Sequence, residues 1–142
     1  ISPFQQENKK IGFFEGNAGD LKFKDDFFDL AFSVDTIHHL NNHLKYFSEA
    51  FRVLNPGGLL ATFTDSEDTI RRREPLAVYF PEIVNYELRR YPLIEKLKAL
   101  SRQVGFKILS EQILETRYIL KDIKKYKNRA FSCLRIIPEA VF

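Results

Sequence analysis

The stretch between residues 28 and 63 constrains the fold of this chain more than any other part of it. Residues 28–34 alternate in character, which is the pattern of a β-strand. Large apolar side chains fall on one face (Phe28, Leu30, Phe32 and Val34), and the other face carries residues small enough to lie under a helix (Asp29, Ala31 and Ser33). Residues 43–54 then show helical apolar spacing, and residues 59–63 form a second apolar strand. A strand, a helix and a strand in this order predict a βαβ unit with parallel strands.

The connection between this helix and the second strand is a turn over Asn55-Pro56-Gly57-Gly58. Proline at the second position and glycine at the third suit a type II turn, which requires a positive φ at the third residue. We therefore expect a positive φ at Gly57. The unit as a whole predicts an α/β protein.

The rest of the chain gives weaker local signals. Residues 65–91 break the regular pattern and are interpreted as an insertion, and a helix is predicted from Pro92 to Val104 with Gly105 as its stop. Further predicted elements are a strand over residues 11–14 that ends in a tight turn at 15–20, a strand over 106–109, another over 113–120, and helical structure over 121–131.

Composition limits the classes of protein to which the chain can belong. Its 142 residues fit one domain, and no apolar stretch approaches the roughly 20 residues needed to span a bilayer, so no membrane partner is expected. A net charge of +3 with mostly dispersed Lys and Arg makes nucleic acid an unexpected partner.

The single cysteine, Cys133, fits a cytoplasmic setting and is interpreted as a small core residue. Because the chain has no methionine even at position 1, we expect it to be a fragment or a processed product.

Four short motifs follow one another at fixed spacing. They are Glu15-Gly16-Asn17-Ala18, Phe28-Asp29-Leu30-Ala31, His38-His39-Leu40 and Arg52-Val53-Leu54-Asn55-Pro56-Gly57-Gly58. This order resembles the class I S-adenosylmethionine-dependent methyltransferases of the type 11 group, in which an E-G-D-A loop, an F-D-L-V strand, an H-H-L run and an R-V-L-K-P-G-G turn follow one another. The resemblance implies a doubly wound, mostly parallel sheet (a Rossmann-like methyltransferase fold) with S-adenosylmethionine as cofactor. It also implies that residues 1–142 are the C-terminal two-thirds of the domain, truncated upstream of the glycine-rich motif and carrying a substrate-side insertion at about 65–91.

The resemblance also assigns candidate cofactor-binding residues. Gly16, Asn17 and Ala18 would bracket adenine, through the Asn17 side chain and the Ala18 N–H. Leu21, with Phe23, would line the slot for the adenine ring. Ser33 and Val34 would offer backbone groups to the methionine end of the cofactor. Asn17 stands where the family usually has Asp; its carbonyl oxygen can still accept from the adenine amino group, and the alternative is that Asn17 is only a turn residue.

Catalytic residues are not apparent from the sequence. His38 and His39 are candidates for a base, and the alternative is a packed scaffold histidine. No metal site is expected at His38, His39 and His43, because no acidic or thiol ligand stands at a companion spacing. Methyl transfer from an activated sulfonium needs mainly positioning, so the absence of a catalytic constellation agrees with the assignment.

The acceptor pocket is expected above the strand ends, beside the insertion. Tyr79 and Tyr86 are candidates to line it, and the alternative is that they pack the insertion on its own core. Arg71-Arg72-Arg73 is a candidate for attracting an anionic acceptor, and the alternative is a solvated face.

The predicted function is S-adenosylmethionine-dependent methyl transfer to a small-molecule acceptor. Methyltransferases of DNA amino groups resemble one another in an Asp/Asn-Pro-Pro-Tyr/Phe run, where this chain has Ser33-Val34-Asp35-Thr36. An RNA or protein methyltransferase, a non-catalytic methyltransferase-like interaction module and a nucleotide-dependent reductase are the alternatives. We expect residues 1–142 alone to bind the cofactor poorly and to be inactive. An unpaired strand edge could also pair with a second copy of the chain, which would give a homodimer.

Overall fold

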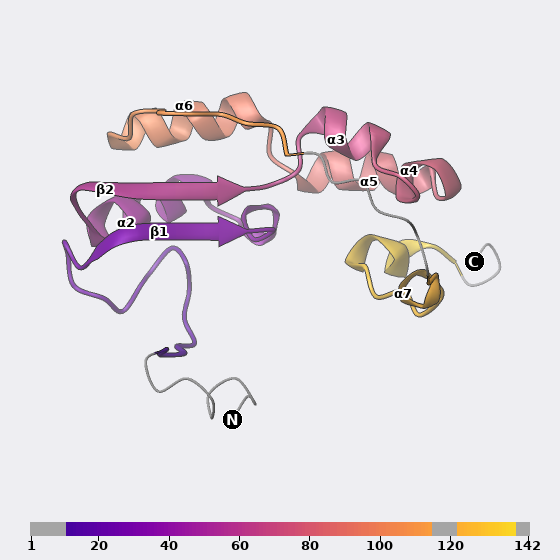
Figure 1. Ribbon diagram of the computed structural model, residues 1–142, viewed down its shortest axis with the longest axis horizontal. Coiled ribbons are helices and arrows are strands. Elements are labelled where there is room, and N and C mark those ends of the chain that lie inside the picture. The colour runs from indigo at the N-terminus through magenta and orange to yellow at the C-terminus, as the bar shows by residue number, and fades with distance from the viewer. Residues whose placement is uncertain (1–10, 115–121, 139–142) are drawn as a thin grey trace.

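The computed structural model describes residues 11–114 and 122–138. The described chain forms two halves that lie beside each other (Figure 1). One half contains both strands with helices α2 and α6, and the other contains the short helices α3, α4, α5 and α7. The chain passes from the first half to the second just after the arrowhead of β2, so the carboxyl end of the sheet faces the junction between them (Figure 1).

The predicted βαβ unit is confirmed. Strand β1 (Phe28–Val34) pairs in parallel with β2 (Leu54–Phe63), and α2 (His43–Val53) connects them. Gly57 has the expected positive φ, +84°. Strand β2 begins earlier than predicted, at Leu54, because the Pro-Gly-Gly turn lies within the strand. The turn coincides with a shift in the register of pairing between Phe28 and Leu30.

Helices α2 and α6 (Ile94–Val104) cover one face of the sheet. Asn42 caps α2, its side chain accepting a hydrogen bond from the Lys45 N–H at 2.9 Å. Four buried residues form the core between these helices, the sheet and the one-turn helix η1 (Ile37–His39): Ile37, Tyr46, Phe47 and Leu97. Gly105 ends α6 as predicted, at φ +121°. The positive φ favours glycine, and a Cβ there would also lie 3.1 Å from the Phe51 ring, which would have to shift slightly.

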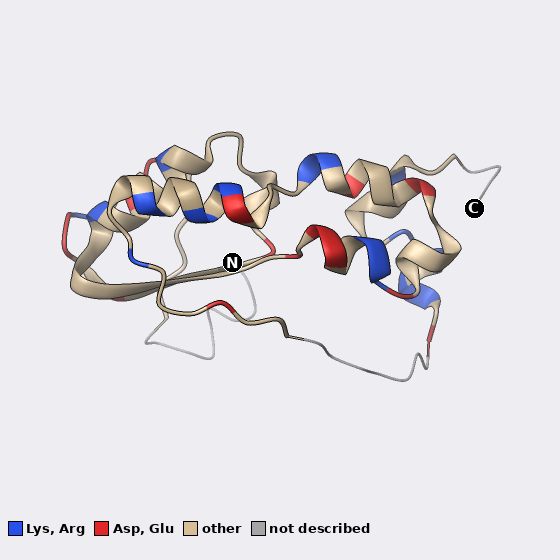
Figure 2. Ribbon diagram, turned by 90° about the horizontal axis from the view of Figure 1, so that it is seen from above, with Lys and Arg blue, Asp and Glu red and all other residues tan. Residues whose placement is uncertain are grey.

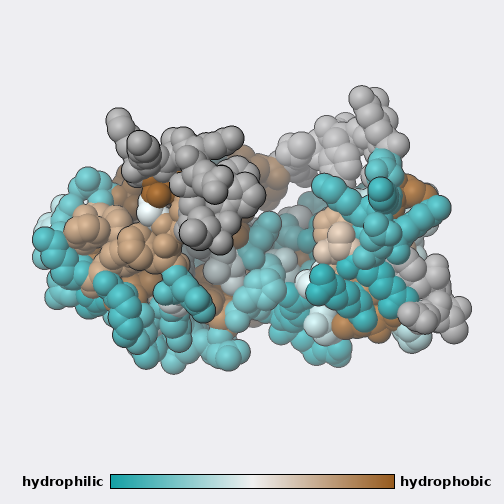
Figure 3. Space-filling view, turned by 90° about the horizontal axis from the view of Figure 1, so that it is seen from below, coloured by the Kyte–Doolittle hydropathy of each residue, from teal (hydrophilic) through white to brown (hydrophobic). Residues whose placement is uncertain are grey.

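The other face of the sheet is apolar and exposed. Leu30 and Phe32 are 55% and 69% exposed, and Val34 and Phe63 are exposed beside them. Apolar surface is visible on the underside of the sheet-containing half (Figure 3). The prediction of an α/β fold with a parallel sheet is thus confirmed, whereas the second helical layer of a doubly wound fold stays a prediction, because no described helix covers this face.

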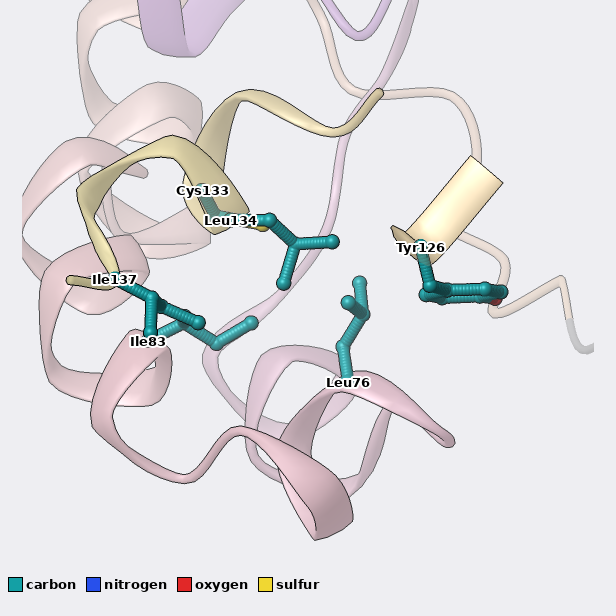
Figure 4. Close-up of a cluster of buried hydrophobic side chains, with 6 residues drawn as sticks. All are labelled: Leu76, Ile83, Tyr126, Cys133, Leu134 and Ile137. Atoms are coloured by element: carbon teal, nitrogen blue, oxygen red, sulfur yellow. The ribbon is translucent and has the colours of Figure 1, made fainter. Parts of the chain in front are cut away.

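Residues 65–91 are largely helical. They form α3 (Glu67–Arg72), α4 (Leu76–Tyr79) and α5 (Glu82–Arg90), followed later by α7 (Lys124–Lys127) and the 3-10 helix η2 (Ser132–Ile136). A second core joins these elements, built from Leu76, Ile83, Tyr126, Cys133, Leu134 and Ile137 (Figure 4). The interpretation of Cys133 as a small core residue is confirmed. The helix predicted over 121–131 is shorter than expected in its described part.

Two predicted strands are wrong. Residues 11–14 and 106–109 form no strand, because the sheet of the described chain contains only β1 and β2. The Phe14 ring packs edge-to-face on Phe23, with 5.4 Å between centroids. Phe106 packs its ring on Phe51 instead, at 5.1 Å between centroids. The strand predicted over 113–120 lies mostly outside the described residues. Across the described residues, no helix is both long and apolar enough to cross a bilayer.

Candidate functional site

A cavity of about 450 Å³ lies between β1, α2 and the turn after residue 16. Ala18, Leu21, Ser33 and Val34 line it, so the structure brings together four of the six predicted cofactor residues. The remaining walls are mainly apolar and come from both strands, α2 and the residue that precedes η1 (Ala31, Phe32, Thr36, Tyr46, Ala50, Val53 and Leu60). An apolar slot with a few convergent hydroxyl groups has the general composition of a small-molecule site.

Gly16 and Asn17 do not line this cavity. The Asn17 side-chain oxygen accepts a hydrogen bond from the Gly19 N–H at 2.8 Å, and the Asp20 N–H donates to the Asn17 carbonyl at 2.9 Å. The side chain therefore stabilises its own turn, which is the alternative role considered from the sequence. An amide oxygen has two lone pairs, so an accepting position remains for a second donor.

Two residues of α2 hold the segment that follows this turn. The Leu21 N–H donates to Glu49 Oε2 at 2.8 Å, and Arg52 donates to the carbonyls of Phe23 at 2.8 Å and Leu21 at 3.0 Å. Arg52 also pairs with Glu49 at 2.7 Å and with Asp25 at 2.7 Å. The pKa of Glu49 is lowered to about 2, mainly because its carboxylate accepts hydrogen bonds from Arg52. Sequence reasoning missed this clamp, although the i, i+3 spacing of Glu49 and Arg52 is a helix-pair signal.

Tyr46 is the second site residue that sequence reasoning missed. Its hydroxyl donates to Ser33 Oγ at 3.0 Å and lies 3.4 Å from Thr62 Oγ1, which ties α2 to both strands. The side chain is 7% exposed and contributes to the cavity wall. A tyrosine at an inward position of an otherwise apolar helix face was the available signal, since a buried hydroxyl needs a partner.

The carboxyl end of the sheet holds a separate group of polar residues, in which His38 is central. The His38 ring stacks on Tyr91, with 4.0 Å between centroids and 22° between planes. Burial, followed by the charges of His39 and Arg90, lowers the pKa of His38 to about 4, so the ring is neutral at pH 7. Burial likewise raises the pKa of Tyr91 to about 12. His39 is exposed, and neither histidine lines the cavity.

Ion pairs surround the stacked rings. Arg73 pairs with Asp65 and, at 3.1 Å, with Glu87; Arg90 pairs with Glu87 at 2.9 Å. Burial is the main cause that raises the pKa of Asp65. Hereafter the edge cluster denotes the residues His38, Thr64, Asp65, Arg73, Glu87, Arg90 and Tyr91.

The arginine run predicted as an anion attractor is mostly paired. Arg73 belongs to the edge cluster, and Arg72 pairs with Asp68 on the surface of α3. Basic and acidic residues are interspersed on α6 and on the helices of the second half (Figure 2). The charge that would attract an anionic acceptor is therefore largely compensated within the chain.

Tyr79 and Tyr86 lie away from the cavity. Tyr79 is 74% exposed on α4. Tyr86 packs against the second core and lies 5.4 Å from the Arg90 guanidinium, ring centroid to Cζ. The structure therefore places Tyr86 in the role considered as the alternative, that of packing the 65–91 segment.

His43 also has a structural contact, its Nε2 lying 3.0 Å from the Ile37 carbonyl. In the parts of the chain that the structure describes, no three His, Cys, Asp or Glu side chains gather closely enough to hold a metal ion.

Comparison with known proteins gives matches among methyltransferases. The family model described as "Methyltransferase domain" matches residues 2–62. Squalene methyltransferase 1 of Botryococcus braunii is 45% identical over 69 residues, covering 44% of this chain and 18% of the relative. O-methyltransferase rstn1 of Aspergillus nomiae is 30% identical over 100 residues, covering 70% and 44%. 24-methylenesterol C-methyltransferase 2 of Oryza sativa is 27% identical, covering 89% and 39%.

The chain thus spans less than half the length of these curated relatives. No solved structure matches it significantly. The family match covers the segment that folds into the turn, β1, α2 and most of β2, which are the elements that carry the four sequence motifs. The family match and the relatives together support the assignment of this segment to a class I S-adenosylmethionine-dependent methyltransferase domain.

Proposed function

We propose that the protein transfers a methyl group from S-adenosylmethionine to a small, largely apolar acceptor. The observation that carries the proposal is the cavity beside β1, in which residues of the matched segment converge. Ala18 and Leu21 lie on the side where the adenine ring would bind, and Ser33 and Val34 lie where the methionine end would bind.

The composition of the cavity fits this cofactor. Its apolar walls suit a flat adenine ring, and the hydroxyl groups of Thr36 and Tyr46 are held by Val34 O and Ser33 Oγ rather than left unpaired. The bound cofactor supplies a methyl group already activated by a sulfonium. The contribution of the chain is to orient that methyl group toward the acceptor and to exclude water, which requires a rigid wall. The clamp of Glu49 and Arg52 supplies such rigidity to the segment after the turn.

The nature of the relatives favours a small organic acceptor over RNA or protein. Their names include squalene, sterol and botryococcene methyltransferases and an O-methyltransferase. These names also do not favour the non-catalytic interaction module. We further propose that residues 1–142 are the C-terminal two-thirds of the domain with an insertion at 65–91, that the protein is cytoplasmic, and that it can form a homodimer.

A transfer assay tests the proposed function. The full-length protein is incubated with methyl-tritiated S-adenosylmethionine and, separately, squalene, a sterol and a simple terpene alcohol, and label is counted in the organic extract. We expect a labelled product with at least one acceptor. Ala18→Glu, which places a carboxylate in the cavity wall, should abolish transfer, whereas Val78→Thr on the exposed surface of α4 should not. Cofactor binding without a labelled product for any acceptor would favour the non-catalytic module.

A further inference from the structure

We propose that the edge cluster binds a hydroxyl group of the acceptor, and that the acceptor is uncharged where it meets the cluster. This inference deepens the proposed function and rests on it. It concerns the polar group by which the acceptor is held, which neither the cavity nor the family match specifies.

The cluster lies where a parallel sheet presents its ligands. Strands β1 and β2 end at Val34 and Phe63, and the Asp35 N–H donates to the Phe63 carbonyl at 3.1 Å, so the residues that follow the two strands lie side by side. His38 follows β1 within η1, and Thr64 and Asp65 follow β2 directly. Ligands of open parallel sheets bind at the carboxyl ends of the strands.

Unsatisfied polar atoms mark the cluster. In the described parts of the chain, the buried side-chain nitrogen and oxygen atoms without a hydrogen-bond partner are His38 Nδ1, Thr64 Oγ1 and Arg73 Nε. All three belong to the edge cluster. Thr64 and Asp65 directly follow β2, and Arg73 pairs with Asp65, so the three orphan atoms belong to residues at or next to this end of the sheet. Buried polar groups normally have partners, which marks this end of the sheet as a place where a polar ligand binds.

The chemistry of these atoms selects the ligand. Arg73 Nε can only donate a hydrogen bond, whereas Nδ1 of a neutral imidazole accepts or donates according to its tautomer, and the Thr64 hydroxyl can do either. A hydroxyl group both donates and accepts, so it can serve His38 Nδ1 and one of the donors. A carboxylate can only accept and an ammonium group can only donate, so neither can serve both tautomers of His38 as a hydroxyl group does.

The charges of the cluster agree with a neutral ligand. Two cations (Arg73 and Arg90) are paired with two carboxylates (Asp65 and Glu87). An anion would add negative charge beside Asp65 and Glu87, and a cation would add positive charge beside Arg73 and Arg90. The stacked rings of His38 and Tyr91 offer a flat wall for the apolar body of the same molecule.

A matched set of probes tests the charge of the ligand. Cyclohexylmethanol, cyclohexanecarboxylate and cyclohexylmethylammonium share one ring and differ in the polar group. Their affinities for the full-length protein saturated with S-adenosylhomocysteine are measured by ligand-observed NMR. We expect the alcohol to bind at least about tenfold more tightly than either ion, which corresponds to about 1.4 kcal/mol. Tighter binding of the carboxylate or the ammonium, or equal binding of all three, would overturn the inference.

A pair of variants tests the residue. His38→Phe keeps a ring to stack on Tyr91 but removes Nδ1, and His39→Phe makes the same change at the exposed neighbour. We expect His38→Phe to weaken binding of the alcohol about tenfold and His39→Phe to leave it unchanged. Equal affinities in His38→Phe and the wild type would contradict the assignment, as would an equal loss in both variants.

A measurement on the wild type covers the case in which His38→Phe does not fold. The alcohol should shift the nitrogen NMR resonance of His38 Nδ1, and an unmoved resonance on saturation with the alcohol would contradict contact. Failure of S-adenosylhomocysteine to bind the wild type would contradict the proposed function itself. Failure of the alcohol to bind a cofactor-loaded protein would contradict only this inference.

Discussion

Replacing Arg52 with methionine should detach the segment over residues 21–25 from α2. The change keeps the aliphatic stem of the side chain and removes the guanidinium. That group donates to two backbone carbonyls, at 2.8 and 3.0 Å, and to the carboxylates of Glu49 and Asp25. The substitution also leaves the carboxylate of Glu49, whose side chain is 17% exposed, without its cation.

The expected cost follows from these contacts. A hydrogen bond contributes about 0.5–1.5 kcal/mol net, and one to a charged group about 1.5–3 kcal/mol. The Arg52 side chain is 30% exposed, so water replaces part of what is lost. We therefore expect Arg52→Met to lower the free energy of unfolding by about 2–3 kcal/mol.

Arg72→Met is the matched control. Arg72 also pairs with a carboxylate on its own helix, Asp68, but both side chains are more than half exposed. Its loss should cost less than about 0.5 kcal/mol. The assay is urea unfolding of the full-length protein, with hydrogen exchange at the Leu21 N–H as a local readout. Equal destabilisation by the two variants, or unchanged protection at Leu21 in Arg52→Met, would refute the clamp.

Three further predictions use other contacts. Tyr46→Phe removes the hydroxyl that donates to Ser33 and should cost about 1 kcal/mol of unfolding free energy in urea, whereas an unchanged midpoint would show that the bond contributes nothing. Leu134→Ala in the fully buried second core should cost about 2–5 kcal/mol by the same assay, and a cost below 1 kcal/mol would mean that this core is not closely packed. His38 and Glu49 both have a lower pKa in the folded protein than in the unfolded chain, so acidification favours unfolding. We expect His38 to lower stability as the pH falls from 6.5 toward about 4, and Glu49 to lower it as the pH falls from 4.5 toward about 2. In urea unfolding at stepped pH, His38→Phe should flatten the first interval and Glu49→Gln the second, and parallel curves would contradict these shifts.

Elements fixed by local pattern could be predicted from the sequence. The alternation of residues 28–34 gave β1, the helical spacing after Asn42 gave α2, and Gly105 gave the end of α6. In each case the deciding interactions lie within a few residues, as in the Asn42 cap, so a short window of sequence contains them.

The wrong strands show where such windows fail. Residues 106–109 have the apolar character of a strand, but a strand needs a hydrogen-bonding partner, which a local pattern cannot supply. The Phe106 N–H donates instead to the Ser101 carbonyl at 3.1 Å, and the ring packs on Phe51. Packing of Phe106 against the helix layer replaces pairing with β2.

The same distinction holds for the site. The turn at Asn17 and the strand end at Ser33 follow from motifs, and the structure places both beside the cavity elements. The clamp from Glu49 to Leu21 joins residues 28 positions apart, and the stack of His38 on Tyr91 joins two halves of the fold. Such contacts depend on how the elements pack against each other. A local sequence pattern therefore predicts the turn at Asn17 but not the distant residues that stabilise the segment after it.

The most direct test of the central claim is calorimetric titration of S-adenosylhomocysteine into the full-length protein, with NAD as the competing nucleotide and Ala18→Glu as the variant of the cavity wall. The claim that this chain carries the cofactor-facing wall of a methyltransferase predicts saturable binding of S-adenosylhomocysteine, no binding of NAD, and a loss of at least about tenfold in affinity in Ala18→Glu. Absence of heat at high S-adenosylhomocysteine concentration, or unchanged affinity in Ala18→Glu, would contradict it.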